Sequence, residues 1–252
     1  MSRYFLELSY CGTKYNGWQI QANTPHTIQQ ILNDVLSTTL RHPVTLVGCG
    51  RTDAGVHAKQ FFAHFDSLTL ADHPFEFWLH KWNSMLPDDI AVHRLYCVTP
   101  NANARYDAIS RTYEYHIHQR KDPFLYQRSW YYSQTLNNAI IQEGIQKIKQ
   151  HTDFACFTKD ASEYNHTQCI IYDIQWNVQD HRIVFVITAN RFLRNMVRAI
   201  VGTLIWLGIG KYTLNDLENI LLSGDRKKAG FSAPAEGLYL TQIKYPESIF
   251  IL

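Results

Sequence analysis

The sequence lacks the cysteine spacing of a cross-linked or zinc-binding protein. Its five cysteines are odd in number and widely spread, and none of them forms a C-x-x-C pair. This spacing disfavours both a disulfide framework and a four-cysteine zinc site. We expect scattered buried thiols in a protein of a reducing compartment.

A long apolar segment is also missing. The longest apolar run covers roughly residues 199–210, whereas a helix that crosses a bilayer needs about 20 residues. The first ten residues contain no apolar run before a small-residue cleavage site, so no secretory signal is predicted. We therefore expect a soluble, cytoplasmic protein that makes no membrane contact.

The chain carries little excess charge of either sign. Its formal net charge is +2, which is low for a protein that coats a nucleic-acid duplex, although a local basic patch still attracts phosphates. Arg191, Arg194 and Arg198 recur at helical spacing and predict one cationic helix face. The other basic residues that could follow an RNA backbone are Arg105, Arg111, Arg120, Lys121, Arg226, Lys227 and Lys228.

Short periodic segments alternate between strand and helix patterns. A capping-box pattern at Thr27 and Gln30 predicts the start of the first helix. The remaining helices are predicted after Pro74 and at 136–148, 192–207 and 214–222. Strands are predicted at 4–10, 44–47, 61–65, 90–98, 113–117, 170–178, 183–187 and 238–245. Because strands adjoin one another and helices are interspersed, the pattern indicates an α+β fold.

The second half of the chain loosely repeats the element order of the first half. Residues 101–111 are the expected junction between the halves. We predict two similar domains, 1–105 and 106–252, each with an antiparallel-rich mixed sheet flanked by helices.

Chemistry is concentrated in residues 48–58, where Gly48, Gly50 and Gly55 surround Arg51 and Asp53. The simplest interpretation is a turn whose aspartate caps local amides. A nucleotide-phosphate loop is disfavoured because the glycine motif is incomplete and no Gly-Lys-Ser/Thr follows it. An aspartic protease needs two carboxylates that share a proton, and no second Asp-Thr/Ser-Gly occurs.

Residues 50–57, Gly-Arg-Thr-Asp-Ala-Gly-Val-His, resemble the catalytic segment of the tRNA pseudouridine synthase A (TruA) family. Further blocks resemble that family in the same order along nearly the whole chain. These blocks are residues 10–19, 86–90, 103–106, 111–115, 195–202 and 233–238.

The resemblance implies the pseudouridine synthase fold, with an active-site cleft between the two domains and Asp53 as the catalytic carboxylate. The implied reaction breaks the uridine N1–C1′ bond and rejoins the base through C5, with no metal or organic cofactor. The carboxylate attacks C1′ or C6, or it removes the C2′ proton, and the sequence leaves these routes open. The resemblance also makes Arg198 the ion-pair partner that keeps this carboxylate charged.

Three further residues receive substrate-binding roles from the resemblance. Tyr113 would stack on the target base, since a flat ring with a polar tip suits a flipped pyrimidine. Arg51 would accompany base flipping and fill the vacated space or hold the phosphate. Arg105 would contact the RNA backbone.

The implied substrate is the tRNA anticodon stem-loop, with uridines at positions 38, 39 and 40 as targets and a homodimer gripping the tRNA. One alternative is a non-catalytic tRNA-binding or chaperone protein of the same fold. Another is a hydrolase, which would need a second carboxylate aimed at water. The chain departs from the family pattern at Ile20 and Gln168, which affects the expected RNA grip rather than the reaction.

Overall fold

The computed structural model describes residues 1–251, apart from the side chains of Thr69 and Ala71. The chain forms two compact units: residues 1–109 with 239–252, and residues 110–238. The junction at 109/110 falls within the predicted 101–111 region. The C-terminal segment differs from the predicted division, because it joins the first unit rather than the second.

The first unit has an antiparallel sheet in which β1 (Ser2–Tyr10) lies between β4 (Ile90–Val98) and β3 (His57–Ser67). The short strand β2 (Val47–Gly48) also pairs with β3. The last strand, β9 (Leu238–Lys244), pairs in parallel with the start of β3. That parallel pairing explains why the C-terminal segment belongs to this unit.

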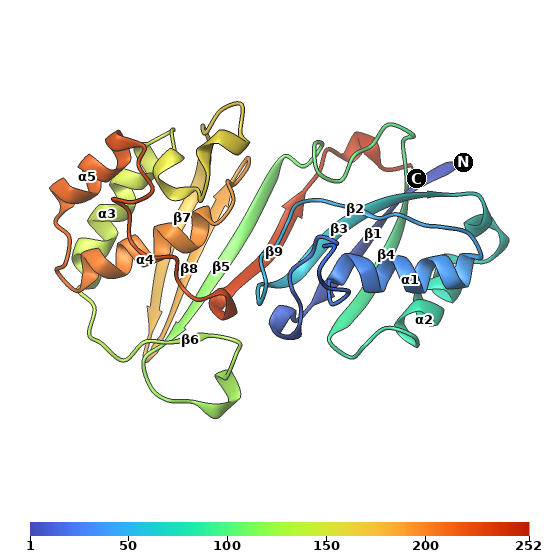
Figure 1. The fold of residues 1–252 in the computed structure, drawn as a ribbon, viewed down its shortest axis with the longest axis horizontal. Helices are drawn as coiled ribbons and strands as arrows, with labels where there is room; N and C mark the ends of the chain where they lie inside the picture. The colour runs from blue at the N-terminus through green and yellow to red at the C-terminus, as the bar shows by residue number, and fades with distance from the viewer. Residues whose placement is uncertain (252) are drawn as a thin grey trace. The chain divides into compact units, whose positions relative to one another are not determined.

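Two helices cover the core of the first unit (Figure 1). They are α1 (Ile28–Leu40) and α2 (Phe75–Asn83). Trp82 of α2 donates its indole N–H to the Thr39 hydroxyl of α1 at 2.9 Å. The apolar stripes of both helices face inward, as their spacing predicts.

The predicted capping box of α1 is half correct. The Thr27 side chain accepts a hydrogen bond from the Gln30 amide. The Gln30 side chain does not return the bond and donates to Asp34 instead. The Thr27 amide is already bonded to the Pro25 carbonyl at 2.9 Å, so a reciprocal partner is not needed.

The second unit contains an antiparallel sheet of β5 (Ser110–His118), β8 (Arg182–Ala189) and β7 (Ile171–Gln179), with β6 (Trp130–Tyr131) added beside β5. The predicted hairpin is confirmed, with Asp180 at φ 52° in its turn. Three helices gather beside β7 and β8 (Figure 1). These are α3 (Asn138–Gln150), α4 (Met196–Gly208) and α5 (Leu214–Ser223). The α+β fold class is therefore confirmed.

Several predicted boundaries are wrong for identifiable reasons. Residues 44–46 form no strand although Val44 and Leu46 are buried, so burial imitated a strand pattern. Strand β3 begins at His57, inside the segment predicted as a turn. Helix α4 begins at Met196 rather than Phe192, because Asn195 adopts a left-handed conformation with φ 69°.

The late start of α4 also overturns the predicted cationic helix face. Arg191 and Arg194 precede the helix. Arg191 lies over the ring of Tyr164 at 5.6 Å, and Arg194 approaches the Glu163 carboxylate at 3.5 Å. Only Arg198 of the three belongs to α4.

No helix among residues 1–251 is both long enough and apolar enough to cross a membrane. All five cysteines are free thiols in the structure. Cys49, Cys156 and Cys169 are buried, as expected, whereas Cys11 and Cys97 are half-buried.

Candidate active site

Asp53 lies in the loop that leads into β3, and its residue is half-buried. The Asp53 carbonyl accepts a hydrogen bond from the Val56 amide at 3.2 Å, which closes a tight turn. Gly55 within the turn has φ 80°, a conformation that glycine adopts without steric cost. The predicted glycine-dependent turn is therefore present, and it carries the candidate carboxylate.

The Asp53 loop is fastened to residues 10–19, another block of the family resemblance. The Trp18 amide donates to the Thr52 carbonyl at 3.1 Å, and the hydroxyls of Tyr10 and Thr52 are hydrogen-bonded at 2.8 Å. Gly17 passes so close that an added Cβ would lie 2.4 Å from the Thr52 carbonyl oxygen. These contacts fix the backbone on the N-terminal side of Asp53.

His57 fixes the loop on its C-terminal side. The Gly12 amide donates to His57 Nδ1 at 3.1 Å, so this nitrogen carries no proton. An added Cβ on Gly12 would lie 1.9 Å from the Val56 carbonyl oxygen, which shows how closely the two segments approach. The His57 ring also stacks on Tyr239 of β9, with 4.5 Å between ring centroids.

The block at residues 86–90 joins the same assembly. The Cys11 amide donates to the Asp89 carbonyl at 2.9 Å, and the Tyr15 hydroxyl donates to the Asp89 carboxylate. Burial, followed by the neighbouring Asp89, raises the pKa of Tyr15 above its usual range, so the phenol stays protonated. The block at residues 86–90 thus holds residues 10–19, which in turn contact the Asp53 loop.

Two predicted substrate-binding arginines belong to this unit. Arg51 precedes the Asp53 turn and is exposed. Arg105 is exposed in the loop after β4, and its guanidinium lies over the ring of Tyr106 at 5.5 Å. Both side chains are accessible to a ligand from solvent.

Arg198 lies in the first turn of α4 and is half-buried. Its Nε donates to the Ala233 carbonyl at 2.6 Å, while the Ala233 amide donates to the Arg198 carbonyl at 3.0 Å. Gly202 permits this contact, because a Cβ there would lie 1.8 Å from the Phe231 carbonyl oxygen. Two further blocks of the resemblance, 195–202 and 233–238, are therefore packed together.

Tyr113 and Tyr115 project from the same face of β5, because they are two residues apart. Tyr115 is fully buried and donates its hydroxyl to the Pro234 carbonyl at 2.7 Å. Burial raises the pKa of Tyr115 well above its usual range, and the charge of Arg198 opposes that rise. Tyr113 is half-buried and meets Phe192 edge-on at 5.0 Å between ring centroids.

The structure thus divides the predicted site residues between the units. Asp53, Arg51 and Arg105 belong to the first unit, and Tyr113 and Arg198 belong to the second. Within the second unit, residues 233–234 bond to both Arg198 and the strand that carries Tyr113.

Sequence reasoning gave no role to His57 or to the Tyr15–Asp89 hydrogen bond. Each of these residues falls inside a recognised block, and that position was the only signal available. Among residues 1–251, no group of three or more His, Cys, Asp or Glu side chains is arranged to hold a metal ion.

Comparison with known proteins defines the class of the chain. Residues 150–246 match the family model described as tRNA pseudouridine synthase. A tRNA pseudouridine synthase A of Porphyromonas gingivalis is 43% identical over 100% of both chains. That of Parabacteroides distasonis is 42% identical over 99% of this chain and 98% of its own. The enzyme of the same name from Ruminiclostridium cellulolyticum is 38% identical, covering 97% of this chain and 100% of its own.

These matches place the chain in the class of pseudouridine synthases. At this identity over the full length, the chain belongs to the tRNA pseudouridine synthase A family. The family resemblance inferred from the motifs is confirmed.

Proposed function

We propose that this protein converts uridine to pseudouridine in the anticodon stem-loop of tRNA, at positions 38, 39 and 40, with Asp53 as the essential carboxylate. The observation that carries the proposal is the support of the Asp53 loop. Residues 10–19 hold the loop through hydrogen bonds to Thr52 and His57, and residues 86–90 hold residues 10–19 in turn, while Asp53 itself stays half-buried. Such preorganisation is typical of a catalytic group that must meet a reacting atom in a fixed geometry.

The chemistry requires no group beyond a carboxylate and proton exchange with water. Asp53 attacks C1′ or C6, or removes the C2′ proton, and the N1–C1′ bond breaks. The base turns and C5 bonds to C1′. The carboxylate then has left C1′ or C6, or has returned the proton to C2′, and the C5 proton passes to water while N1 gains a proton. An ionised carboxylate serves each route, as nucleophile or as base.

Arg198 is proposed to keep Asp53 ionised during this reaction. A guanidinium beside a carboxylate lowers the pKa of that carboxylate. What supports the assignment is the family resemblance together with the anchoring of Arg198 through Nε, which constrains the rest of the guanidinium. An arginine held in this way loses little side-chain entropy when it forms an ion pair.

The remaining residues are proposed to bind the flipped nucleotide and the RNA backbone. Tyr113 offers a half-buried ring for stacking on the uracil. Arg51, exposed two residues before Asp53, would take the space that the flipped base leaves or hold its phosphate. Arg105 would bind a phosphate of the RNA backbone.

Tritium release from tRNA that carries tritium at uridine C5 tests the proposal, because bond formation at C5 displaces that atom. We expect the wild type to release tritium without added cofactor. Asp53→Asn should lower release by at least roughly 10³-fold, as for loss of an essential nucleophile or base, with tRNA binding retained. Asp180→Asn, an exposed aspartate in the β7–β8 turn, is the matched control and should remain active.

The alternatives give different results in the same assay. Binding of tRNA without tritium release would indicate the non-catalytic tRNA-binding or chaperone protein. Free uracil among the products would indicate the hydrolase. Normal turnover by Asp53→Asn would remove Asp53 from its proposed role.

The Arg198 assignment predicts a loss of turnover. Arg198→Ala removes the guanidinium that is proposed to pair with the Asp53 carboxylate, so kcat for tritium release should fall by roughly 10²-fold or more. Arg198→Lys retains the positive charge and should lose less. A wild-type kcat in a folded Arg198→Ala protein would contradict the pairing.

A homodimer that grips one tRNA in the cytoplasm completes the proposal, on the strength of the family resemblance. Sedimentation of the protein with and without tRNA tests it. We expect a dimer in both cases and one tRNA bound across two subunits.

A further inference from the structure

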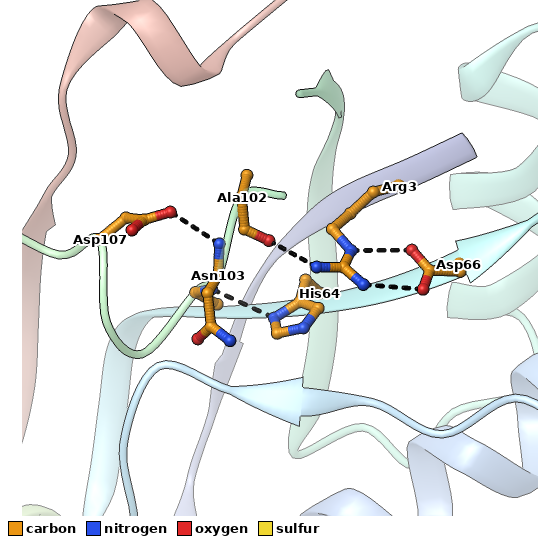
Figure 2. Close-up of polar contacts among 7 residues, drawn as sticks. Arg3, His64, Asp66, Ala102, Asn103 and Asp107 are labelled. Carbon is orange, nitrogen blue, oxygen red and sulfur yellow. Dashed lines mark hydrogen bonds and ion pairs between the residues drawn. The ribbon is translucent and has the colours of Figure 1, made fainter. Parts of the chain in front are cut away.

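A buried histidine on β3 lies beneath the loop that carries Arg105. His64 is 5% exposed. It lies beside the ion pair in which Arg3 Nε and Nη2 donate to Asp66 Oδ1 and Oδ2, each at 2.8 Å. Figure 2 shows the His64 ring between this pair and the loop at residues 102–107. His64 lies outside all of the family motifs, so these motifs give it no role in the reaction.

His64 accepts a hydrogen bond from this loop. The Ala104 amide donates to His64 Nδ1 at 3.1 Å, so Nδ1 carries no proton and the ring is neutral with its proton on Nε2. Burial first, and then the charge of Arg3, lower the pKa of His64 to about 4. The acceptor is therefore present throughout the neutral pH range.

The other hydrogen bonds of the loop converge on the same short segment. The Tyr245 hydroxyl donates to the Ala104 carbonyl at 2.6 Å, so Ala104 is held at both ends of its backbone. The Asn103 side chain accepts from the amides of Arg105 and Tyr106 at 3.0 and 3.2 Å. Arg3 also donates to the Ala102 carbonyl at 3.0 Å (Figure 2).

This rigid backbone presents an exposed cation. Arg105 follows Ala104 directly, and its guanidinium lies over the Tyr106 ring. The ring orients the guanidinium while both side chains remain exposed. A cation that is preorganised in this way loses less conformational entropy when it meets a phosphate.

We propose that His64 is a positioning residue for tRNA binding: its Nδ1 fixes Ala104 and thereby places Arg105 against the RNA backbone. The inference rests on the proposed function, because it requires a tRNA substrate. His64 acts through the loop and touches no reacting atom, so its loss should weaken binding rather than slow the chemical step.

The test compares two substitutions of His64. His64→Leu removes the acceptor, whereas the Oδ1 of His64→Asn occupies roughly the place of Nδ1 and restores it. We expect His64→Leu to raise the KM for tRNA roughly five- to tenfold at unchanged kcat, in line with the loss of one preorganised contact. His64→Asn should stay within about twofold of wild type.

A double substitution separates positioning from general damage. In an Arg105→Ala background the contact is already lost, so His64→Leu should change KM by less than about twofold. A full five- to tenfold increase in that background would overturn the proposal. So would a folded His64→Asn protein with the KM of His64→Leu.

Tyr245→Phe tests the same idea should His64→Leu fail to fold. It removes the bond to the Ala104 carbonyl without touching His64, and it should raise KM only when Arg105 is present. Failure of the proposed function is distinguishable, because the wild type would then release no tritium. Filter binding of the same variants to tRNA would still measure the effect of His64 on affinity.

Discussion

At the scale of single residues, two glycines of the candidate site differ in whether a side chain would fit in their place. Gly17 has φ 87°, and an added Cβ would lie 2.4 Å from the Thr52 carbonyl oxygen. Gly17→Ala should therefore lower the free energy of unfolding by at least about 2 kcal/mol, because strain and a backbone clash act together. It should also reduce kcat by displacing the Asp53 loop. Urea denaturation and tritium release measure the two effects.

Gly50 is the matched control, although it lies in the same segment as Asp53. A Cβ on Gly50 meets nothing within 4 Å, and Gly50 is not among the positive-φ glycines. Gly50→Ala should change the free energy of unfolding by no more than about 0.5 kcal/mol. Equal losses in the two variants would contradict the close approach of Gly17 to Thr52.

At the scale of secondary-structure elements, sequence periodicity predicted the strands and turns that depend on residues close together in the chain. The strand at 90–98 and the hairpin around Asp180 were predicted correctly, because turn residues bound the strands and because apolar residues alternate along the hairpin. The start of α4 was missed because Phe192 and Leu193 continue the apolar pattern outside the helix. The pairing of β9 with β3 was also missed, since residues 57 and 239 meet only in the folded chain.

The candidate site likewise has a part that the sequence predicted and a part that only the structure shows. Asp53 was recognised from a contiguous motif, whereas its support by His57 and Gly12 depends on a hydrogen bond between segments 45 residues apart. His64 lies outside every recognised block, and only the structure connects it with Ala104. Sequence patterns identify candidate reacting groups more readily than the residues that position them.

Strand β3 should make stability depend on pH through His64. The folded pKa of His64 is about 4, below the ordinary 6.5, because burial and Arg3 disfavour the charged ring. Below pH 6.5 His64 binds a proton in the unfolded chain but stays neutral in the folded protein. The free energy of unfolding therefore falls as the pH drops from about 6.5 toward 4.

His64→Asn isolates this contribution, since its amide does not titrate. Between pH 7 and 4.5, the wild type should lose roughly 2 kcal/mol more than His64→Asn in urea denaturation. Asp66 and Asp107 also face His64 and raise its pKa slightly. They are present in both proteins, so their own titration largely cancels. Parallel pH profiles would contradict a buried neutral His64.

At the scale of the whole molecule, a net charge of +2 gives little long-range attraction for a polyanion. Affinity for tRNA must then come from a few cations placed at phosphates, each of which releases a counterion on binding. If Arg105 is one of them, Arg105→Ala should reduce the slope of log K against log salt by roughly 0.7–0.9, along with the affinity itself.

Lys147 provides the control for this salt titration. It is as cationic as Arg105, but it lies on α3 and is paired with Glu218 of α5 at 2.7 Å. Lys147→Ala should leave the salt slope unchanged, although it removes the same net charge. If both variants lowered the slope equally, binding would follow total charge rather than placement, and the proposed role of the Arg105 loop in holding tRNA would fail. A loss confined to Arg105→Ala would show that a nearly neutral protein grips RNA through cations fixed in position by the fold.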